Sequence, residues 1–196
     1  MSSASAEARV QPLIDTTLSL ADCTDVSRVG FRGAQAASWL EGLGLTLPQR
    51  PNKAVKQQDG SLVARLSQTE YLWLGAIADQ GARVGREEAR WEQNQTANYL
   101  LPRQDSHAWL QLSGDRISEV MAKLCGVNLH PSAFCEGDVA QTSVARLSCI
   151  VINATRGKAP CFYLLFDRPS LAYLKEVLVD AMDEFQRYRG QAKADR

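Results

Sequence analysis

The 196-residue sequence has little histidine and no excess of either charge. It contains two histidines, and its 22 lysine and arginine residues balance 22 aspartate and glutamate residues. A chain without a basic surplus lacks the attraction that holds nucleic acid or an anionic membrane surface. Scarce histidine also leaves few bases for acid–base or nucleophilic chemistry. We therefore expect no binding to nucleic acid and none to membranes.

Long apolar runs and paired cysteines are missing as well. No run approaches the roughly 20 apolar residues that cross a bilayer, and residues 1–20 lack the apolar core of a secretory signal. The five cysteines form no C-x-x-C pair, and their odd number argues against a disulfide framework or a zinc site. Their mostly apolar neighbours are typical of buried free thiols. These absences predict a cytoplasmic protein.

Recognisable catalytic and phosphate-binding motifs are also absent. Neither G-x-x-x-x-G-K-[ST] nor G-x-G-x-x-G occurs. Asp105, Ser106 and His107 resemble a triad, but consecutive residues of a strand point to opposite faces and cannot form a relay. His130 follows a predicted helix end, where a positive side chain is favourable. We expect no catalytic, cofactor-binding or metal-binding residue in this chain.

What the sequence does contain is an internal repeat. The pentapeptide VARLS occurs at residues 63–67 and again at 144–148, which is 81 positions later. The same displacement aligns two alternating segments that end at Gly33 and Gly114. It also aligns two sets of apolar residues with helical spacing, at positions 36, 39, 40 and 43 and at positions 117, 120, 121 and 124. The chain therefore contains two copies of one unit.

Each copy has the pattern of an α+β unit in the order strand, helix, strand, strand, helix. We predict strands at 28–32, 63–67 and 70–74 in the first copy, and at 108–112, 144–148 and 162–166 in the second. Turn-forming residues at 156–160 precede the last strand. A final amphipathic helix carries an apolar stripe from Leu171 to Phe185. The predicted fold is a pair of β-α-β-β-α units with helices on one face of each sheet.

The copies are too short to bury their apolar faces alone, so we predict one pseudo-duplicated domain at residues 21–188. Its first copy covers 22–100 and its second copy covers 101–188. Residues 1–20 are expected to be a disordered N-terminus, and residues 189–196 a flexible tail.

Five residues are candidates for contact with a partner or an anion. Arg65 and Arg146 hold the same place in the repeated pentapeptide, on the face opposite its apolar neighbours. A solvent-facing or partner-facing arginine and an anion ligand are both possible there. Tyr71 and Trp73 share one face of a predicted strand whose leucines fill the other, and Trp109 similarly opposes its leucine neighbours. Another chain or the second copy would cover these aromatic faces.

Two further segments of the sequence are mostly polar. Residues 48–61 are expected to form a long loop and a turn, and loops often carry function. Residues 75–102 mix Arg83, Arg86 and Arg90 with neighbouring glutamates. Paired charges produce little net field, which favours a solvated helix over a basic ligand-binding face.

Short motifs between about residue 22 and residue 185 resemble the gamma subunits of heterotetrameric sarcosine oxidases. They are DVSRVGFRG at 25–33, PRQD at 102–105, LSG at 112–114, LCGV at 124–127 and TSVAR at 142–146. More broadly, the chain is similar to the aminomethyltransferase, or glycine-cleavage T-protein, superfamily. This resemblance implies the T-protein-like folate-binding-domain fold.

The sequence differs from that superfamily at the residues that carry out its catalysis. Members have a Gly-Gly-x-x-Asp-Asp-like stretch whose acid acts on the folate-bound carbon. The corresponding residues 59–65 read DGSLVAR, with no acid after the turn. The Lys-Gly-Cys-Tyr-x-Gly-Gln signature of folate-binding iron–sulfur repair proteins is also absent. The resemblance thus implies a scaffold that lacks the catalytic carboxylate.

The resemblance further implies a non-catalytic subunit of a cytoplasmic complex that oxidises sarcosine or a similar secondary amine. The products would be glycine or the free amine, hydrogen peroxide, and formaldehyde or methylenetetrahydrofolate. The chain would scaffold the large alpha subunit, with beta and delta subunits completing the complex. FAD, FMN, NAD, tetrahydrofolate and zinc would bind elsewhere in that complex. The alternative is a stand-alone tetrahydrofolate-binding or one-carbon-transfer protein of the same superfamily.

Overall fold

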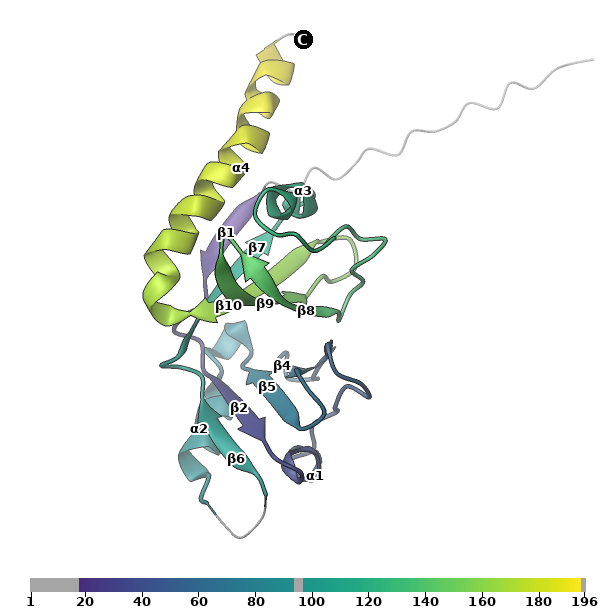
Figure 1. The fold of residues 1–196 in the computed structure, drawn as a ribbon, viewed down its shortest axis with the longest axis vertical. Coiled ribbons are helices and arrows are strands. Elements are labelled where there is room, and N and C mark those ends of the chain that lie inside the picture. Colours follow the sequence, from purple (N-terminus) through teal and green to yellow (C-terminus); the bar gives the residue numbers. More distant parts are fainter. Residues whose placement is uncertain (1–17, 94–96, 195–196) are drawn as a thin grey trace, which may run out of the picture.

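Two antiparallel five-stranded sheets stacked face to face form the centre of the molecule (Figure 1). This computed structural model describes residues 18–93 and 97–194, with side chains described up to residue 185. The first sheet has the strand order β3-β4-β5-β2-β6 and the second has β1-β7-β10-β9-β8.

The strands of the first sheet are β2 (Arg28–Arg32), β3 (Lys53–Lys56), β4 (Leu62–Arg65), β5 (Glu70–Leu74) and β6 (Tyr99–Pro102). Those of the second sheet are β1 (Ser19–Asp22), β7 (His107–Ser113), β8 (Val139–Val144), β9 (Leu147–Asn153) and β10 (Cys161–Asp167). The α-helices are α1 (Ala36–Gly42), α2 (Ala82–Arg90), α3 (Ile117–Ala122) and α4 (Leu171–Ala194). Two short 3₁₀ helices are η1 (Ile77–Asp79) and η2 (Arg168–Ser170).

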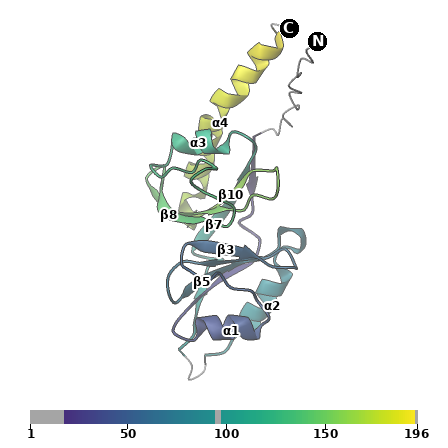
Figure 2. The ribbon, with the colours of Figure 1, turned by 90° about the vertical axis from the view of Figure 1, so that its right-hand side faces the viewer.

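The helices cover the outer face of each sheet, so the molecule has four layers (Figure 2). Helices α1 and α2 pack on the first sheet, and α3 and α4 pack on the second. Alternation along the strands fills both faces of each sheet. In β5, Leu72 and Leu74 point to the layer between the sheets, while Tyr71 and Trp73 point to the helices. The α+β fold predicted from the repeat, with helices on one face of each sheet, is confirmed.

The two copies exchange their edge strands. Strand β1 precedes β2 in sequence, yet it pairs with β7 in the second sheet, where Leu20 lies opposite Leu112. Strand β6 precedes β7, yet it pairs with β2 in the first sheet, where Leu100 lies opposite Phe31. The displacement of 81 residues aligns β1 with β6, so the two copies begin at these strands, a few residues before the predicted bounds of 22 and 101. Each sheet therefore contains one strand from the other copy.

The displacement of 81 residues holds for the strand–helix part of the repeat. Strands β2 and β7 both end at a glycine with positive φ, 143° at Gly33 and 126° at Gly114, and helices α1 and α3 follow. A Cβ on Gly33 would lie 2.1 Å from the Ala97 carbonyl oxygen, so a side chain cannot be placed there. Strands β2 and β5 have the predicted bounds.

The repeated pentapeptide, in contrast, is not structurally equivalent in the two copies. The first occurrence lies largely in β4, as predicted. The second spans the turn between β8 and β9, where Ala145 and Arg146 have φ values of 48° and 69°. The position of β4 in its sheet corresponds to that of β9. The predicted strand at 144–148, and the equivalence of Arg65 with Arg146, are therefore wrong.

Other differences concern edges and ends. Strands β1, β3, β6 and β8 were not predicted, so each sheet has two more strands than the three predicted for its copy. Strand β3 lies within the predicted loop at 48–61. Residues 1–17 of the predicted disordered segment lie outside the described residues. Leu18 is buried and Ser19 begins β1, so the order of the chain begins before residue 21. Helix α4 continues through residue 194 into the predicted tail.

Candidate functional site

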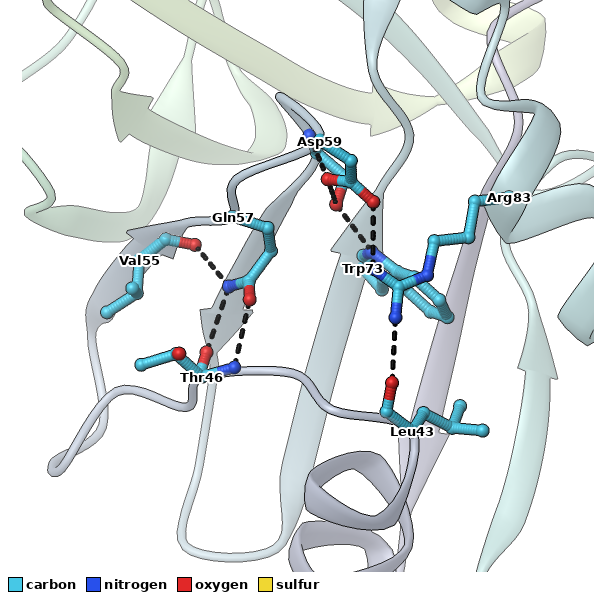
Figure 3. Close-up of polar contacts among 8 residues, drawn as sticks. Leu43, Thr46, Val55, Gln57, Asp59, Trp73 and Arg83 are labelled. Carbon is cyan, nitrogen blue, oxygen red and sulfur yellow. Dashed lines mark hydrogen bonds and ion pairs between the residues drawn. The ribbon is translucent and has the colours of Figure 1, made fainter.

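Asp59 begins the tight turn before β4, where Gly60 has a φ of 89°. Its Oδ1 accepts hydrogen bonds from the Ser61 backbone N–H at 2.9 Å and from the Ser61 hydroxyl at 2.6 Å. Its Oδ2 accepts one from Arg83 Nη1 at 2.9 Å, and Arg83 Nη2 donates to the Leu43 carbonyl at 2.7 Å. Arg83 on α2 thus joins the turn to the end of α1 (Figure 3).

The Trp73 indole closes the other side of this cluster. Its Nε1 donates to Ser61 Oγ at 3.1 Å, and the Arg83 guanidinium carbon lies 5.4 Å from its ring centroid. Ser61 is 1% exposed, so a substrate cannot reach its hydroxyl. Asp59 and Ser61 therefore form a structural pair instead of a nucleophile with its base.

Hydrogen bonding also determines the charge of Asp59. Burial raises the pKa of Asp59, but hydrogen bonds from Ser61 and Arg83 outweigh burial, and the pKa lies below its ordinary value of 3.8. The carboxylate is ionised at neutral pH and fully engaged by its donors.

Gln57 orders the remainder of the predicted loop at 48–61. Its Nε2 donates to the Thr46 and Val55 carbonyls, and its Oε1 accepts from the Thr46 N–H at 2.9 Å (Figure 3). The backbone N–H of Gln57 donates to the Ser61 carbonyl at 2.8 Å. The segment is thus tied into the first copy by internal bonds, which gives it a structural role.

The three predicted aromatic contact residues are covered by the chain itself. Trp73 and Tyr71 are 0% and 2% exposed in the layer between the first sheet and its helices. Trp109 is 0% exposed between the two sheets, edge-on to Tyr163 at 5.0 Å. The sequence left another chain or the second copy as the cover of these faces. Tyr71 and Trp73 are instead covered by α1 and α2 of their own copy, whereas Trp109 is covered by the sheet of the other copy.

The two predicted arginines lie in different surroundings. Arg65 donates to the carbonyls of Gln49 and Gln68, each at 2.9 Å, and lies 5.5 Å over the Tyr71 ring. These bonds hold the segments around Gln49 and Gln68 against β4. Arg146 is exposed on the β8–β9 turn. The structure brings Arg65 and Tyr71 together, whereas Trp109 and Arg146 belong to other parts of the molecule.

The histidines and acids of the described ranges show no cluster of three or more ligands that could hold a metal ion. His107 is partly buried, and its Nδ1 lies 2.8 Å from Ser106 Oγ. Burial lowers the pKa of His107 to about 4, and the positive charges of Arg103 and Arg28 add to this effect. None of the helices in the described part of the chain is long and apolar enough to span a membrane.

Arg28 is a structural residue that the sequence reasoning missed. It is 0% exposed, and its Nη1 donates to the carbonyls of Thr24 at 2.9 Å and Val26 at 2.8 Å. Its Nη2 donates to the carbonyls of Gln104 and His107, which lead into the second copy. Burial lowers the pKa of Arg28 to about 10, with Arg168 adding to the shift. The only signal in the sequence was an arginine at the position aligned with Trp109.

A groove runs along the seam between the two copies. Cavities of about 430 and 550 Å³ share Gly60, Ala154, Arg156 and Tyr163, and together they form what we call the seam groove. One wall comes from β3 and the Asp59 turn, and the other from the β9–β10 connection. No sequence pattern indicated this groove directly, although both walls include predicted loop or turn segments.

Comparison with known proteins supports the resemblance seen in the motifs. The chain is 27% identical over 184 residues to sarcosine oxidase subunit gamma of Corynebacterium sp. strain P-1, covering 92% of this chain and 87% of that protein. No protein-family model matches the chain.

Two solved structures share the fold. A chain of heterotetrameric sarcosine oxidase from Corynebacterium sp. U-96, solved with pyrrole 2-carboxylate, matches with a TM-score of 0.69 and 21% identity, over 86% of this chain and 85% of that one. Aminomethyltransferase T of the glycine cleavage system from Bartonella henselae matches with a TM-score of 0.61 and 13% identity, over 84% of this chain but 46% of that one. The chain is thus similar to a sarcosine oxidase gamma subunit along most of its length and has the aminomethyltransferase-like fold.

Proposed function

We propose that this chain is a gamma-type subunit of a heterotetrameric, sarcosine oxidase-like complex. The observation that carries the proposal is the end-to-end similarity to a sarcosine oxidase gamma subunit, over 92% of this chain and 87% of the relative. Similarity that spans both proteins favours a shared role over a shared segment. The subunit docks on the alpha subunit and scaffolds it, and the beta and delta subunits complete the cytoplasmic complex.

The chain's own residues support a non-catalytic role. Residues 59–65, which by the family resemblance correspond to the acid-bearing stretch of the aminomethyltransferases, lead from the Asp59 turn into β4, where Leu62, Val63 and Ala64 are buried. The nearest acid, Asp59, is held by Ser61 and Arg83. One-carbon chemistry therefore has no available carboxylate at this position.

The cofactors of such a complex fit the other subunits better than this chain. Both sheets are antiparallel throughout the described ranges, so the βαβ unit that binds a dinucleotide is not formed there. This favours binding of FAD and NAD by the partner subunits, and the family resemblance supports the same assignment for FMN, tetrahydrofolate and zinc. The whole complex would oxidise sarcosine or a similar secondary amine to glycine or the free amine, hydrogen peroxide, and formaldehyde or methylenetetrahydrofolate.

Co-expression with the alpha, beta and delta subunits of the same source tests the proposal. We expect a complex of equal stoichiometry that contains flavin, oxidises sarcosine and retains this chain through gel filtration. Omission of this chain should reduce the yield of soluble alpha subunit. A chain that never co-purifies with those subunits would contradict the proposal.

The alternative, a stand-alone folate-binding protein, has the aminomethyltransferase-like fold in its favour. Against it, the chain spans less than half of the matched aminomethyltransferase, and Tyr71 is buried. Calorimetric titration of the isolated chain with tetrahydrofolate separates the two functions. Saturable binding would favour the alternative, and an absence of heat and of thermal stabilisation would remove it.

A further inference from the structure

The seam groove carries two exposed cations on opposite walls, together with two acids, Glu136 and Asp59, of which Asp59 is already paired with Arg83. Lys56 belongs to β3 of the first copy, and Arg156 to the β9–β10 connection of the second. Within the described ranges, the ion pairs include neither of them, whereas nearby Lys53 and Arg83 pair with Asp138 and Asp59.

Lys56 and Arg156 line the same cavity, where their positive charges repel each other. Burial lowers the pKa of Lys56, the positive charge of Arg156 lowers it further, and Glu136 only partly opposes these effects. Two cations that repel each other across a groove are stabilised by an anion placed between them. Since Asp59 is paired with Arg83, Lys56 and Arg156 outnumber Glu136 in the groove, and this balance favours a negatively charged occupant.

The rest of the groove is suited to apolar groups. Ala54, Leu62 and Ala154 line one cavity, and Tyr163 borders both. Tyr163 is held edge-on against Trp109, so it presents a fixed aromatic surface. Ile77, which is 36% exposed, lies at the rim of the second cavity. Apolar side chains exposed beside a concave site are typical of protein contacts.

We propose that the seam groove binds an extended acidic segment of a partner subunit. A carboxylate of that segment lies between Lys56 and Arg156, and its apolar side chains lie against Tyr163 and Ile77. Two cavities joined in the middle fit an extended chain better than one compact molecule. The inference rests on the proposed function, because it names how the gamma-type subunit recognises its partner.

Charge reversal of both cations tests the inference. The Lys56→Glu/Arg156→Glu variant is titrated against the purified complex of the partner subunits, beside the wild type and a Lys158→Glu control. Lys158 is exposed in the same connection but does not line either cavity. We expect the double variant to bind at least about tenfold more weakly, the control to bind as the wild type does, and all three to unfold at similar temperatures. Raising the salt should weaken wild-type binding more than binding of the double variant.

The outcomes separate this inference from the proposed function. Wild-type affinity in the double variant would overturn the inference and leave the proposed function intact. Failure of the wild type itself to assemble would overturn the proposed function and, with it, the inference. Thermal protection of the isolated wild type by succinate, lost in the double variant while assembly is unchanged, would assign the groove to a small anion and overturn the peptide proposal.

Discussion

Residues 28 and 109 occupy the same place in the two copies, 81 positions apart, yet one is arginine and the other tryptophan. Both are 0% exposed. Arg28 donates to backbone carbonyls on both sides of the junction between the copies, whereas Trp109 packs against Tyr163 between the sheets. The same backbone position can therefore have different roles in the two copies. Arg28 links the copies by hydrogen bonds, whereas Trp109 fills space in the apolar layer between the sheets.

The largest loss of stability should come from removing the hydrogen bonds that Arg28 donates across the junction between the copies. We expect Arg28→Met to lower the free energy of unfolding by about 3–5 kcal/mol, because buried carbonyls lose a charged donor. Urea denaturation followed by circular dichroism measures the change. Arg32→Met, an exposed position on the same strand, should cost less than about 0.5 kcal/mol. Equal costs for the two variants would contradict the role of Arg28.

The junction should also respond to acid through His107, whose carbonyl accepts from Arg28. Its pKa is about 4 in the folded chain and 6.5 ordinarily, so between pH 6.5 and 4 the unfolded state binds a proton that the folded state does not. Stability is therefore lost as the pH falls through this window, by about 2 kcal/mol once the full linkage value of about 3.4 kcal/mol is reduced for solvent screening of this partly exposed ring. His107→Gln should flatten the dependence of unfolding on pH, and exposed His130→Gln should not. If the free energy of unfolding of His107→Gln changed with pH as steeply as that of the wild type, His107 would not be the group responsible.

A smaller loss of stability is expected at Trp109, the residue of the second copy that corresponds to Arg28. The indole Nε1 of Trp109 has no hydrogen-bond partner within the described part of the chain. Trp109→Phe therefore loses packing volume but no hydrogen bond, and should cost about 1–1.5 kcal/mol in the same urea experiment. A cost above that of Arg28→Met would reverse the comparison between the two positions.

The smallest effect should be at the Asp59 turn, whose counterpart in the second copy, the β8–β9 turn at Ala145 and Arg146, contains no acid. We expect Asp59→Asn to cost about 0.5–1 kcal/mol at neutral pH, since the half-exposed carboxylate binds Ser61 and Arg83. The pKa of Asp59 is lowered in the folded chain, so its contribution is present above about 3.8 and is lost as the pH falls below that value. The difference between wild type and variant should close in acid. Glu136→Gln, at an exposed carboxylate of the second copy, is the control.

Local patterns predicted those elements whose residues alternate clearly between two buried faces. Strands β2 and β5 were found with their bounds for this reason. Strand β3 has the sequence KAVK and lies at a sheet edge, so its composition resembled that of a loop. The pentapeptide was misleading because identical residues adopt different backbones in different surroundings: Arg146 has a positive φ and Arg65 lies in a strand.

The candidate site was harder to predict. Tyr71, Trp73 and Trp109 were chosen because large side chains filled both faces of their strands, but the sequence cannot tell which layer covers each face. Arg28 was missed because a buried arginine has no local signal. Lys56 and Arg156 lie about 100 positions apart in the sequence, and only the stacking of the two sheets places them on one groove.

The exchange of β1 and β6 makes the two copies mutually dependent. A chain divided between α2 and β6 would give two polypeptides, each with one strand that fits the sheet of the other and one sheet edge left vacant. Two identical halves could fill these vacancies reciprocally about a twofold axis. The present chain has the geometry of a strand-swapped homodimer whose protomers are joined in one polypeptide.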